Sequence, residues 1–558
     1  MARARTDAPI LQKPFRLWPG VVAVVLQWLA WLVVPLFNAG ITAGYIAVLG
    51  GFVGGLAVVV WWLFFSRARW PDRVGALVLM VVALVATSLI IHESVRTGMM
   101  GMMFAIYAIP VLSLAFVASA VAGRHLAARS RRVVMAAAIV LASGAWTLVR
   151  TAGITGDGAP DWAWRWTKTP EERLLGRTSD ESLASARDKR PALPAAVGPT
   201  TTPASWCGFR GPARDGVITG VRIETDWAVS PPAELWRRPI GPGWSSFAVQ
   251  GDRLYTQEQR GKDEIVACYS AATGDVLWEH RDTARFWESN GGAGPRATPT
   301  LSNGRVYTFG ATGIVNALDA DDGGVVWSRN AAADTDVKVP YWGFAGSPLI
   351  VDDVVIVAVA GRLAAYDLAT GARRWLGPPG GAGYSSPHLA TIDGIPHILL
   401  LTDAGVVSVA PADGAVLWEH RWPGDGILQP ALIADGDVLL ATGSGLGASG
   451  IVGMRRIAIA HGADGWKAHE RWTSRGLKPY FNDFVVHQGH AFGFDGSILA
   501  CVDLADGQRK WKGGRYGHGQ LVLLSDQNLL LVLSEEGELA LVDATPDQFR
   551  ELARAPAL

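Results

Sequence analysis

The sequence predicts a two-part protein, an N-terminal all-α bundle of five transmembrane helices followed by an all-β propeller of seven blades. Two observations predict this fold class. The first 152 of the 558 residues are dominated by long apolar runs, and the C-terminal part repeats a motif that ends in tryptophan every 39 to 54 residues. We therefore divide the chain into a membrane anchor (1–152), a connector (153–204) and a propeller (205–558), with eight blades as the alternative count.

The predicted anchor consists of five stretches without ionisable side chains in their interiors. Each is long enough, or nearly so, to cross ~30 Å of hydrocarbon. They are Leu17–Phe37, Ile41–Phe65, Val74–Ile91, Gly101–Gly123 and Val133–Val149. Because four more spans follow the first, a cleaved signal peptide is not favoured. Since ion and proton pathways use intramembrane ionisable groups, the spans are expected to anchor the protein in a lipid bilayer.

Basic residues are concentrated in every second connection. The three basic segments contain Arg3, Arg5, Lys13 and Arg16, then Arg67, Arg69 and Arg73, then Arg124, Arg129, Arg131 and Arg132. In the intervening connections, residues 38–40 and 92–100, Arg96 is the only fixed positive charge. Because basic loops remain in the cytoplasm, five spans place the C-terminal domain in the periplasm. The sequence therefore predicts a multi-pass protein of the bacterial inner membrane.

The connector is expected to begin at the outer membrane interface. Three tryptophans lie within Asp161–Leu175, and such amphipathic rings favour the interface. The Thr169-Pro170 pair predicts a helix start, with threonine as the cap and proline at the first helical position. The following stretch, to about Pro203, is expected to be a flexible linker.

The C-terminal repeat has a fixed internal spacing. Five copies of a ten-residue motif end at Trp278, Trp327, Trp375, Trp418 and Trp511, and glycine precedes each tryptophan by four residues (Gly274, Gly323, Gly371, Gly414 and Gly507). A divergent copy ends at Trp472, another near Asp543–Glu551 lacks both residues, and Trp236 has the tryptophan without the turn. Four short alternating strands fit within each period, which is typical of a propeller.

Each part of the motif has a structural interpretation. The glycine supplies positive φ in the turn before the last strand of a blade. The tryptophan is expected to dock between neighbouring blades and bury a large apolar surface. The strand of Trp236 is expected to join the last blade or replace its weak outer strand, which would close the ring.

The motif resembles the PQQ repeat of quinoprotein dehydrogenases and of BamB-type propeller scaffolds. Trp206–Pro212 (WCGFRGP), followed by Arg214-Asp215-Gly216, is similar to the opening of PQQ-like propellers exported by bacteria. The resemblance covers residues 205–558 and implies the propeller fold. Five spans before such a propeller also resemble the layout of membrane-bound glucose dehydrogenase. That likeness implies periplasmic oxidation of a sugar or alcohol with PQQ and electron transfer to ubiquinone.

Three features favour a non-catalytic role. The propeller is shorter than that of quinoprotein dehydrogenases, the chain has no adjacent cysteine pair, and their calcium ligands and catalytic aspartate cannot be mapped onto it. We expect a binding or assembly-scaffold module, with a PQQ- and calcium-dependent dehydrogenase as the alternative. No cluster of metal ligands is predicted, and balanced charge, with 50 basic and 50 acidic residues, argues against nucleic acid as a partner. Cys207, Cys268 and Cys501 are expected to be isolated buried thiols, with one disulfide as the alternative.

The binding site is expected at one mouth of the propeller channel, where loops lead into the innermost strands. Those loops contain Trp244, Arg296, Trp342, Tyr384, Gln429, Asn482, Asp483 and His518. Aromatic and polar groups around a concavity suit a small molecule or a protein. A planar quinone would stack on Trp244 or Trp342, and Arg296 would meet its carboxylate. Asp483 would act as the catalytic base or a calcium ligand. For each residue taken alone, a structural role is the alternative.

The connection Glu279–Pro299 is unusually long for a propeller. It contains His280, Asp282, Arg285 and Glu288 before a glycine-rich stretch. Long connections in compact domains often carry function. The loop is interpreted either as a mobile lid over the mouth or as a solvated brace for the next blade.

Overall fold

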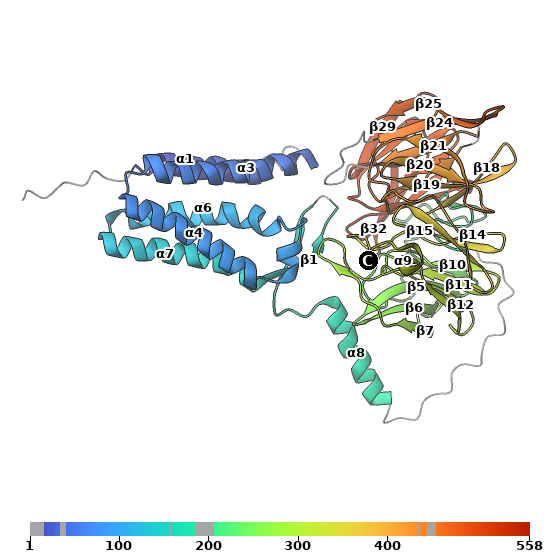
Figure 1. Ribbon diagram of the computed structural model, residues 1–558, viewed down its shortest axis with the longest axis horizontal. Helices are drawn as coiled ribbons and strands as arrows, with labels where there is room; N and C mark the ends of the chain where they lie inside the picture. The colour runs from blue at the N-terminus through green and yellow to red at the C-terminus, as the bar shows by residue number, and fades with distance from the viewer. Residues whose placement is uncertain (1–15, 34–40, 157, 186–205, 434–435, 443–452) are drawn as a thin grey trace, which may run out of the picture. The chain divides into compact units, whose positions relative to one another are not determined.

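The computed structural model describes residues 16–33, 41–156, 158–185, 206–433, 436–442 and 453–558 (Figure 1). The chain divides into two compact units, Met1–Thr167 and Lys168–Leu558, and each is described by itself. The division falls within the predicted connector. The boundaries predicted at 152 and 204 stay predictions.

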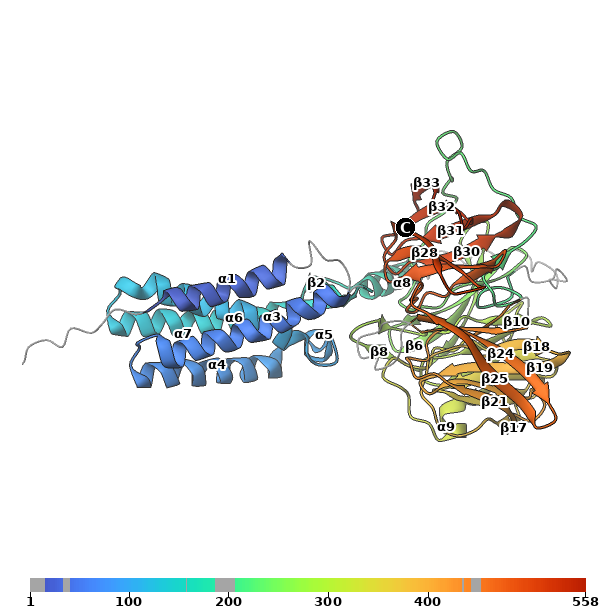
Figure 2. The same cartoon turned by 90° about the horizontal axis from the view of Figure 1, so that it is seen from above.

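The N-terminal unit is built from apolar helices that run side by side (Figure 1, Figure 2). Its long helices are α1 (Trp18–Leu32), α3 (Ile41–Val60), α4 (Trp70–Ile90), α6 (Met103–Ala122) and α7 (Ala128–Gly144). Helix α3 continues into a π-helical turn, η1 (Trp61–Phe65). Short helix α5 (Glu93–Thr97) connects α4 to α6, and the hairpin of β1 (Val149–Ile154) and β2 (Pro160–Trp164) follows α7.

Four of these helices, not five, are long and apolar enough to cross a membrane within the part of the chain that the structure describes. They begin at Gly44, Trp70, Met103 and Ala128. Helix α1 has 15 residues and is ~22 Å long at 1.5 Å per residue, less than the ~30 Å of hydrocarbon. The predicted first span extended to Phe37, and residues 34–40 lie outside the described residues.

Small residues bring α1 and α3 together. A Cβ on Gly54 would lie 2.5 Å from the Cβ of Gln27, and one on Gly50 would lie 2.7 Å from the Cβ of Ala30. The buried Gln27 side chain donates a hydrogen bond to the carbonyl of Gly51, at 2.7 Å. Glycine-mediated contacts of this kind are the usual way helices pack in lipid, where burial of apolar surface gives no driving force between them.

The C-terminal unit begins with α8 (Pro170–Ser185). The Thr169 hydroxyl accepts from the N–H of Glu172 at 3.0 Å, and the Glu172 carboxylate accepts from the N–H of Thr169 at 2.7 Å. This reciprocal pair is a capping box. The predicted helix start is therefore confirmed.

Among the described residues, the rest of the unit consists mainly of seven mostly antiparallel sheets in chain order, six with four strands and one with five, and it also has one small two-stranded sheet. First strands of several successive sheets contact one another, and the first strands surround the axis. They are β4 (Ala248–Gln250), β10 (Thr300–Ser302), β14 (Leu349–Val351), β18 (His388–Ile392), β22 (Ala431–Leu432), β26 (Val485–His487) and β30 (Gln520–Leu524). The last strands are β7 (Val276–Asp282), β13 (Val325–Asn330), β17 (Arg373–Leu376), β21 (Val416–Arg421), β25 (Gly465–Ser474), β29 (Arg509–Arg515) and β33 (Glu551–Pro556).

Between first and last strands, each sheet has two middle strands. These are β5 (Arg253–Arg260) with β6 (Asp263–Ser270), β11 (Arg305–Phe309) with β12 (Ile314–Asp319), β15 (Val354–Val359) with β16 (Arg362–Asp367), β19 (Ile395–Thr402) with β20 (Gly405–Val409), β23 (Val438–Thr442) with β24 (Gly453–Gly462), β27 (His490–Asp495) with β28 (Ile498–Asp503) and β31 (Leu529–Leu533) with β32 (Glu538–Asp543). Most middle-strand residues are buried on both faces. The hydrophobic core therefore lies between sheets.

The repeat tryptophans join neighbouring sheets, as predicted. The ring of Trp327 on β13 lies on Gly371 of the next sheet, where a Cβ would come within 2.6 Å of the ring. Its indole N–H donates to the carbonyl of Leu368, at 3.1 Å. The same glycine contact and the same kind of hydrogen bond are made by Trp278, Trp375 and Trp472. Gly371 has φ +69°, a conformation that favours glycine.

The ring of sheets closes differently from the prediction. Trp236 is not part of a strand. Its ring docks on Gly274 of the first sheet, and Arg237 donates to the carbonyl of Ala557, just after β33, at 3.3 Å. The added strand of the last sheet is instead β3 (Val217–Ile218), which pairs in parallel with β30. Prolines flank Trp236 (Pro231, Pro232 and Pro239), and proline cannot donate to a strand ladder.

The three cysteines are free thiols. Cys268 and Cys501 are buried in separate hydrophobic clusters, and Cys207 is half-buried. Burial raises the pKa of Cys268 and that of Cys501 to about 12. The prediction of isolated buried thiols is confirmed for Cys268 and Cys501, whereas Cys207 is only half-buried.

We expect Trp327→Ala to lower the free energy of unfolding of the propeller by about 3–5 kcal/mol, since it removes a large ring from a buried cluster. Trp342, half-buried in a loop, serves as the matched control, and Trp342→Ala is expected to cost less than about 1 kcal/mol. Denaturant melts of both variants make the comparison. Equal losses would show that the two tryptophans do not differ in packing.

Candidate functional site at the propeller axis and mouth

Residues 206–218 run through the centre of the propeller. Trp206 exchanges two backbone hydrogen bonds with Val249 of β4, and the carbonyl of Cys207 accepts from Leu301 of β10. At the other end of the segment, β3 pairs with β30. Arg214, in the same short segment, bonds to the backbone before β14 of the third sheet, whereas β3 bonds to the last sheet. Because the first strands surround the axis, a segment that bonds to both of these sheets lies at the axis. We call residues 206–218 the axial segment.

Arg214 is the centre of the axial segment. Its guanidinium donates to the carbonyls of Pro348 and Ser347, which precede β14, at 2.7 and 3.1 Å. Burial lowers the pKa of Arg214 to about 10, so the side chain remains charged at neutral pH. Arg214 has φ +55° and Arg210 has φ +60°. Such a conformation costs a non-glycine residue about 1–3 kcal/mol, so the surrounding contacts must hold the segment in place.

Asp483, the predicted catalytic base, is bound by the axial segment. Arg210 Nη1 lies 3.2 Å from Asp483 Oδ2, and both side chains are only 12–13% exposed. The other carboxylate oxygen accepts from the N–H of Gln429 at 3.2 Å. Arg210 also donates to the carbonyl of Phe484, at 2.5 Å. This is the geometry of a structural ion pair, and a catalytic role for Asp483 stays a prediction.

A buried polar pair, Gln429 and His388, lies next to Arg214. The amide of Gln429 approaches His388 Nδ1 to 2.6 Å and the carbonyl of Arg214 to 3.5 Å. Burial, with the charges of Arg214 and Arg210, lowers the pKa of His388 to about 3. His388 is therefore neutral at physiological pH, and its ring nitrogen accepts the amide hydrogen. Directly or through this pair, the axial segment contacts every sheet of the unit.

The guanidinium of Arg296 is buried and paired within the chain, not exposed at the mouth. It forms an ion pair of 3.2 Å with Glu288, and the two side chains are only 8% and 7% exposed. It also donates to the carbonyls of Gly292 and Gly294, at 2.9 and 3.0 Å. Burial lowers the pKa of Arg296 and raises the pKa of Glu288. The carboxylate that Arg296 was expected to meet is thus supplied by the chain itself.

The long connection Glu279–Pro299 forms a packed hairpin. Strands β8 (Trp287–Glu288) and β9 (Gly292–Ala293) pair within it, and Phe286 and Ser289 are buried. Arg285 makes a bidentate ion pair with Glu171 of α8, at 2.8 and 2.9 Å. These contacts favour the interpretation as a brace over that as a mobile lid.

Aromatic rings, unlike these charged groups, reach the surface of the mouth. Trp244 is 61% exposed, and its indole N–H donates to the carbonyl of Gly291 at 2.7 Å. Trp342 and Tyr384 are half-buried, with ring centroids 5.3 Å apart. Tyr341, 48% exposed, packs against Trp342. Burial raises the pKa of Tyr384, so the phenol is neutral.

The last two predicted residues lie on the loops before β26 and β30. Asn482 is fully buried, accepts from the N–H of Tyr480 at 3.0 Å and donates to the carbonyl of Gly519 at 3.1 Å. The ring of His518 lies 5.5 Å from that of Phe481, which is 38% exposed. Asn482 therefore connects two loops, whereas Phe481 extends the aromatic surface of the mouth.

Sequence reasoning missed the arginines of the axial segment. Arg210 and Arg214 were noted only as part of a family motif, and their partners lie more than 130 residues away in the chain. The described residues contain no group of three or more His, Cys, Asp or Glu side chains placed to hold a metal ion.

We expect Arg214→Met to lower the free energy of unfolding by about 2 kcal/mol or more, because it leaves the buried carbonyl of Ser347 without this donor. Arg222 is the matched control, since it is exposed and donates to the carbonyl of Asp526 at 3.1 Å. Arg222→Met should change stability by no more than about 0.5 kcal/mol. Denaturant melts test the difference, and a tolerated Arg214→Met would contradict the structural role of the axial segment.

Known proteins resemble the propeller part of the chain. The curated protein "Outer membrane protein assembly factor BamB" of Shewanella oneidensis is 28% identical over 156 residues, covering 26% of this chain and 36% of that protein. The protein of the same name from Yersinia pestis is 26% identical over 205 residues, covering 34% of this chain and 48% of that protein. The matches thus span between a third and a half of these relatives.

Among solved structures, the quinohemoprotein alcohol dehydrogenase of Comamonas testosteroni is 16% identical, with a TM-score of 0.43, and the match covers 68% of this chain and 77% of that one. The family model described as "Outer membrane protein assembly factor BamB" matches residues 227–388 and 385–552, more than half of the chain. The chain therefore belongs to this family of PQQ-repeat propeller proteins.

Proposed function

We propose that this protein is a membrane-anchored scaffold whose propeller binds a polypeptide partner at the aromatic mouth. Its N-terminal spans lie in the bacterial inner membrane, and a ring of seven blades lies in the periplasm. The assembly-factor name of the curated relatives supports a protein partner. The apolar helices of the N-terminal unit support membrane anchoring.

One observation carries the proposal, namely that the chain's own axial segment lies at the propeller axis. The polar groups around the axis (Arg214, Asp483, Gln429 and His388) bond to one another or to the backbone. A ligand approaching from the mouth meets Trp244, Tyr341 and Phe481, which are 61%, 48% and 38% exposed. Exposed aromatic rings provide much of the binding energy at protein interfaces.

The alternative function is a PQQ-dependent dehydrogenase of a sugar or alcohol, with calcium as its metal. The repeat motif, which is shared with quinoprotein dehydrogenases, favours it. In that case Trp244, Trp342, Tyr384 and His518 would have to contact the quinone at the mouth, with Arg296, Asn482 and Asp483 released from their present partners. Such a rearrangement would leave several buried polar groups without hydrogen bonds.

The two functions are separated by a reconstitution assay. We expect the purified full-length protein, incubated with PQQ and calcium, to reduce no electron-acceptor dye when sugars or alcohols are added. A quinoprotein dehydrogenase loaded with PQQ and calcium under the same conditions is the positive control. Cofactor-dependent turnover with any of these substrates would establish the dehydrogenase instead.

Membrane topology can be tested with reporter fusions. Because basic loops remain in the cytoplasm, a reporter joined after Phe65 or after Gly123 should be active only in its cytoplasmic form. A reporter joined after Arg150 should be active only in its periplasmic form. Cytoplasmic activity of a reporter at the C-terminus would contradict the proposed orientation.

A further inference from the structure

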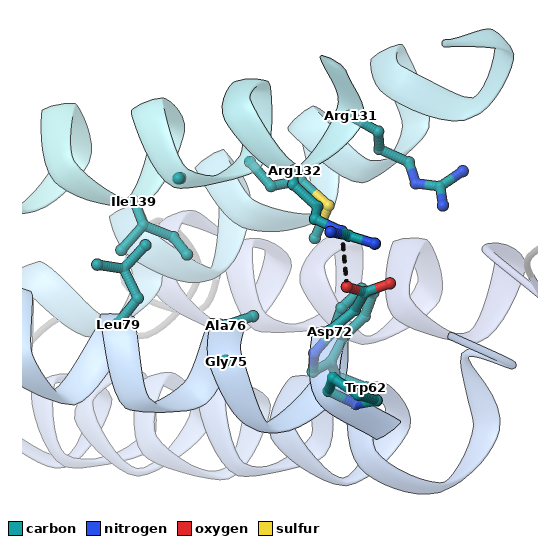
Figure 3. A pocket seen from close by; sticks show the side chains of 11 residues that line it. Trp62, Asp72, Gly75, Ala76, Leu79, Arg131, Arg132 and Ile139 are labelled. Atoms are coloured by element: carbon teal, nitrogen blue, oxygen red, sulfur yellow. Dashed lines mark ion pairs between the residues drawn. The ribbon is translucent and has the colours of Figure 1, made fainter. Parts of the chain in front are cut away.

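A cavity in the N-terminal unit opens between α4 and α7, next to η1 (Figure 3). Its volume is about 220 Å³. The wall is apolar over most of its length and includes Trp62, Leu79, Met135 and Ile139. Leu79 and Ile139 face each other across it, from α4 and α7 (Figure 3). In a helix bundle surrounded by lipid, such a space suits hydrocarbon.

One end of the cavity is charged. Arg131, Arg132 and Asp72 line it, and Arg132 Nε forms an ion pair of 2.8 Å with Asp72 Oδ1 (Figure 3). The Arg132 side chain is nevertheless 56% exposed, so it can accept a second anionic partner from outside. Because two arginines and one aspartate line this end of the cavity, its net charge is positive.

The surrounding loops have the same sign. Residues 66–73 and 123–132 contain seven arginines (Arg67, Arg69, Arg73, Arg124, Arg129, Arg131 and Arg132) and a single acidic residue, Asp72. Clusters of basic residues at the cytoplasmic end of transmembrane helices attract anionic lipids. The arginine-rich end thus complements a negatively charged headgroup, while the cavity complements an alkyl chain.

We propose that the cavity is a binding site for one anionic phospholipid. Its phosphate contacts Arg131 and Arg132, and part of one acyl chain lies between Leu79, Met135 and Ile139. The volume fits this division, because pockets that enclose a whole small molecule measure ~300–1,000 Å³. The site rests on the membrane anchoring in the proposed function, which assigns the lipid to the cytoplasmic leaflet, and it does not depend on the scaffold role.

The structure offers a matched pair of glycine variants for filling the cavity. Gly75 lines it, and a Cβ there would meet no atom within 4 Å. Gly144, the last residue of α7, is equally open and does not line the cavity. Gly75→Leu should place a side chain in the acyl-chain position, and Gly144→Leu controls for a leucine added to a helix of the same unit.

A second matched pair tests the headgroup contact. Arg131→Gln removes a charge from the cavity, whereas Arg129→Gln removes one from the same turn of α7 at an exposed position that does not line it. Both variants change the net charge of this end equally. Nonspecific attraction to anionic lipid would therefore fall equally in both, and specific binding would fall only in Arg131→Gln.

The measurement is native mass spectrometry of the full-length protein in detergent with added phosphatidylglycerol or with phosphatidylcholine of the same acyl chains. We expect one retained phosphatidylglycerol, favoured at least about fivefold over phosphatidylcholine, and an about fivefold loss in Arg131→Gln. Gly75→Leu should lose the bound lipid, and both control variants should retain it.

Three results would overturn the proposal. Equal retention of the two lipids would exclude headgroup recognition, and retention by Gly75→Leu would exclude the cavity. If Gly75→Leu loses the bound phosphatidylglycerol, Arg131→Gln keeps it and a neutral quinone displaces it, the cavity would be assigned to an uncharged amphiphile. The fusions and the dye assay test the proposed function separately. If the fusions contradict the proposed membrane orientation but the lipid still binds, only the assignment to the cytoplasmic leaflet changes. If the orientation is correct but no lipid binds, only the lipid site is rejected.

Discussion

The propeller depends on one repeated contact, an indole ring placed on a glycine of the next sheet. Trp327 on Gly371 is representative, since the ring fills the space that a Cβ would occupy and the indole N–H satisfies the carbonyl of Leu368. Each contact buries a large apolar surface and also fixes the spacing of two sheets. The last sheet lacks its own tryptophan, and Trp236, from the start of the propeller, docks on Gly274 instead. The neighbouring Arg237 donates to the carbonyl of Ala557, so this segment links the start of the propeller to its last strand.

The axial segment imposes a second constraint from the inside. The first strands are only two to five residues long, so the loops before them leave backbone carbonyls and polar side chains near the axis. Arg214 and Arg210 satisfy several of these groups at once. Burying the charge of an arginine side chain costs free energy unless the guanidinium is well hydrogen-bonded. This explains why so many acceptors converge on these two residues. The arrangement favours a rigid centre, and in the proposed function the partner binds at the rim.

The two units differ in which side chains they bury and which they expose. In the propeller, the apolar residues of the middle strands are buried and the outer strands carry the charges. In the helical unit, large apolar side chains such as Leu89 and Leu141 are 74% and 71% exposed, while Gln27 and the glycines of α3 lie at a helix contact. Exposed apolar side chains in such number mark a surface that contacts lipid or another protein. The arginine-lined cavity lies within this helical unit, between α4 and α7.

The sequence alone determined the features that depend on local pattern. The glycine-to-tryptophan spacing predicted the sheets and their docking, the Thr169-Pro170 pair predicted the start of α8, and the apolar runs predicted most of the helices. It also located the aromatic residues of the mouth, Trp244, Trp342 and Tyr384. Only the tertiary structure decided what each charged residue does, since the partners of Asp483, Arg296 and Arg214 come from other loops. A charge looks the same in a sequence whether it faces a ligand or an ion-pair partner, because long-range contacts alone determine its burial and its pKa.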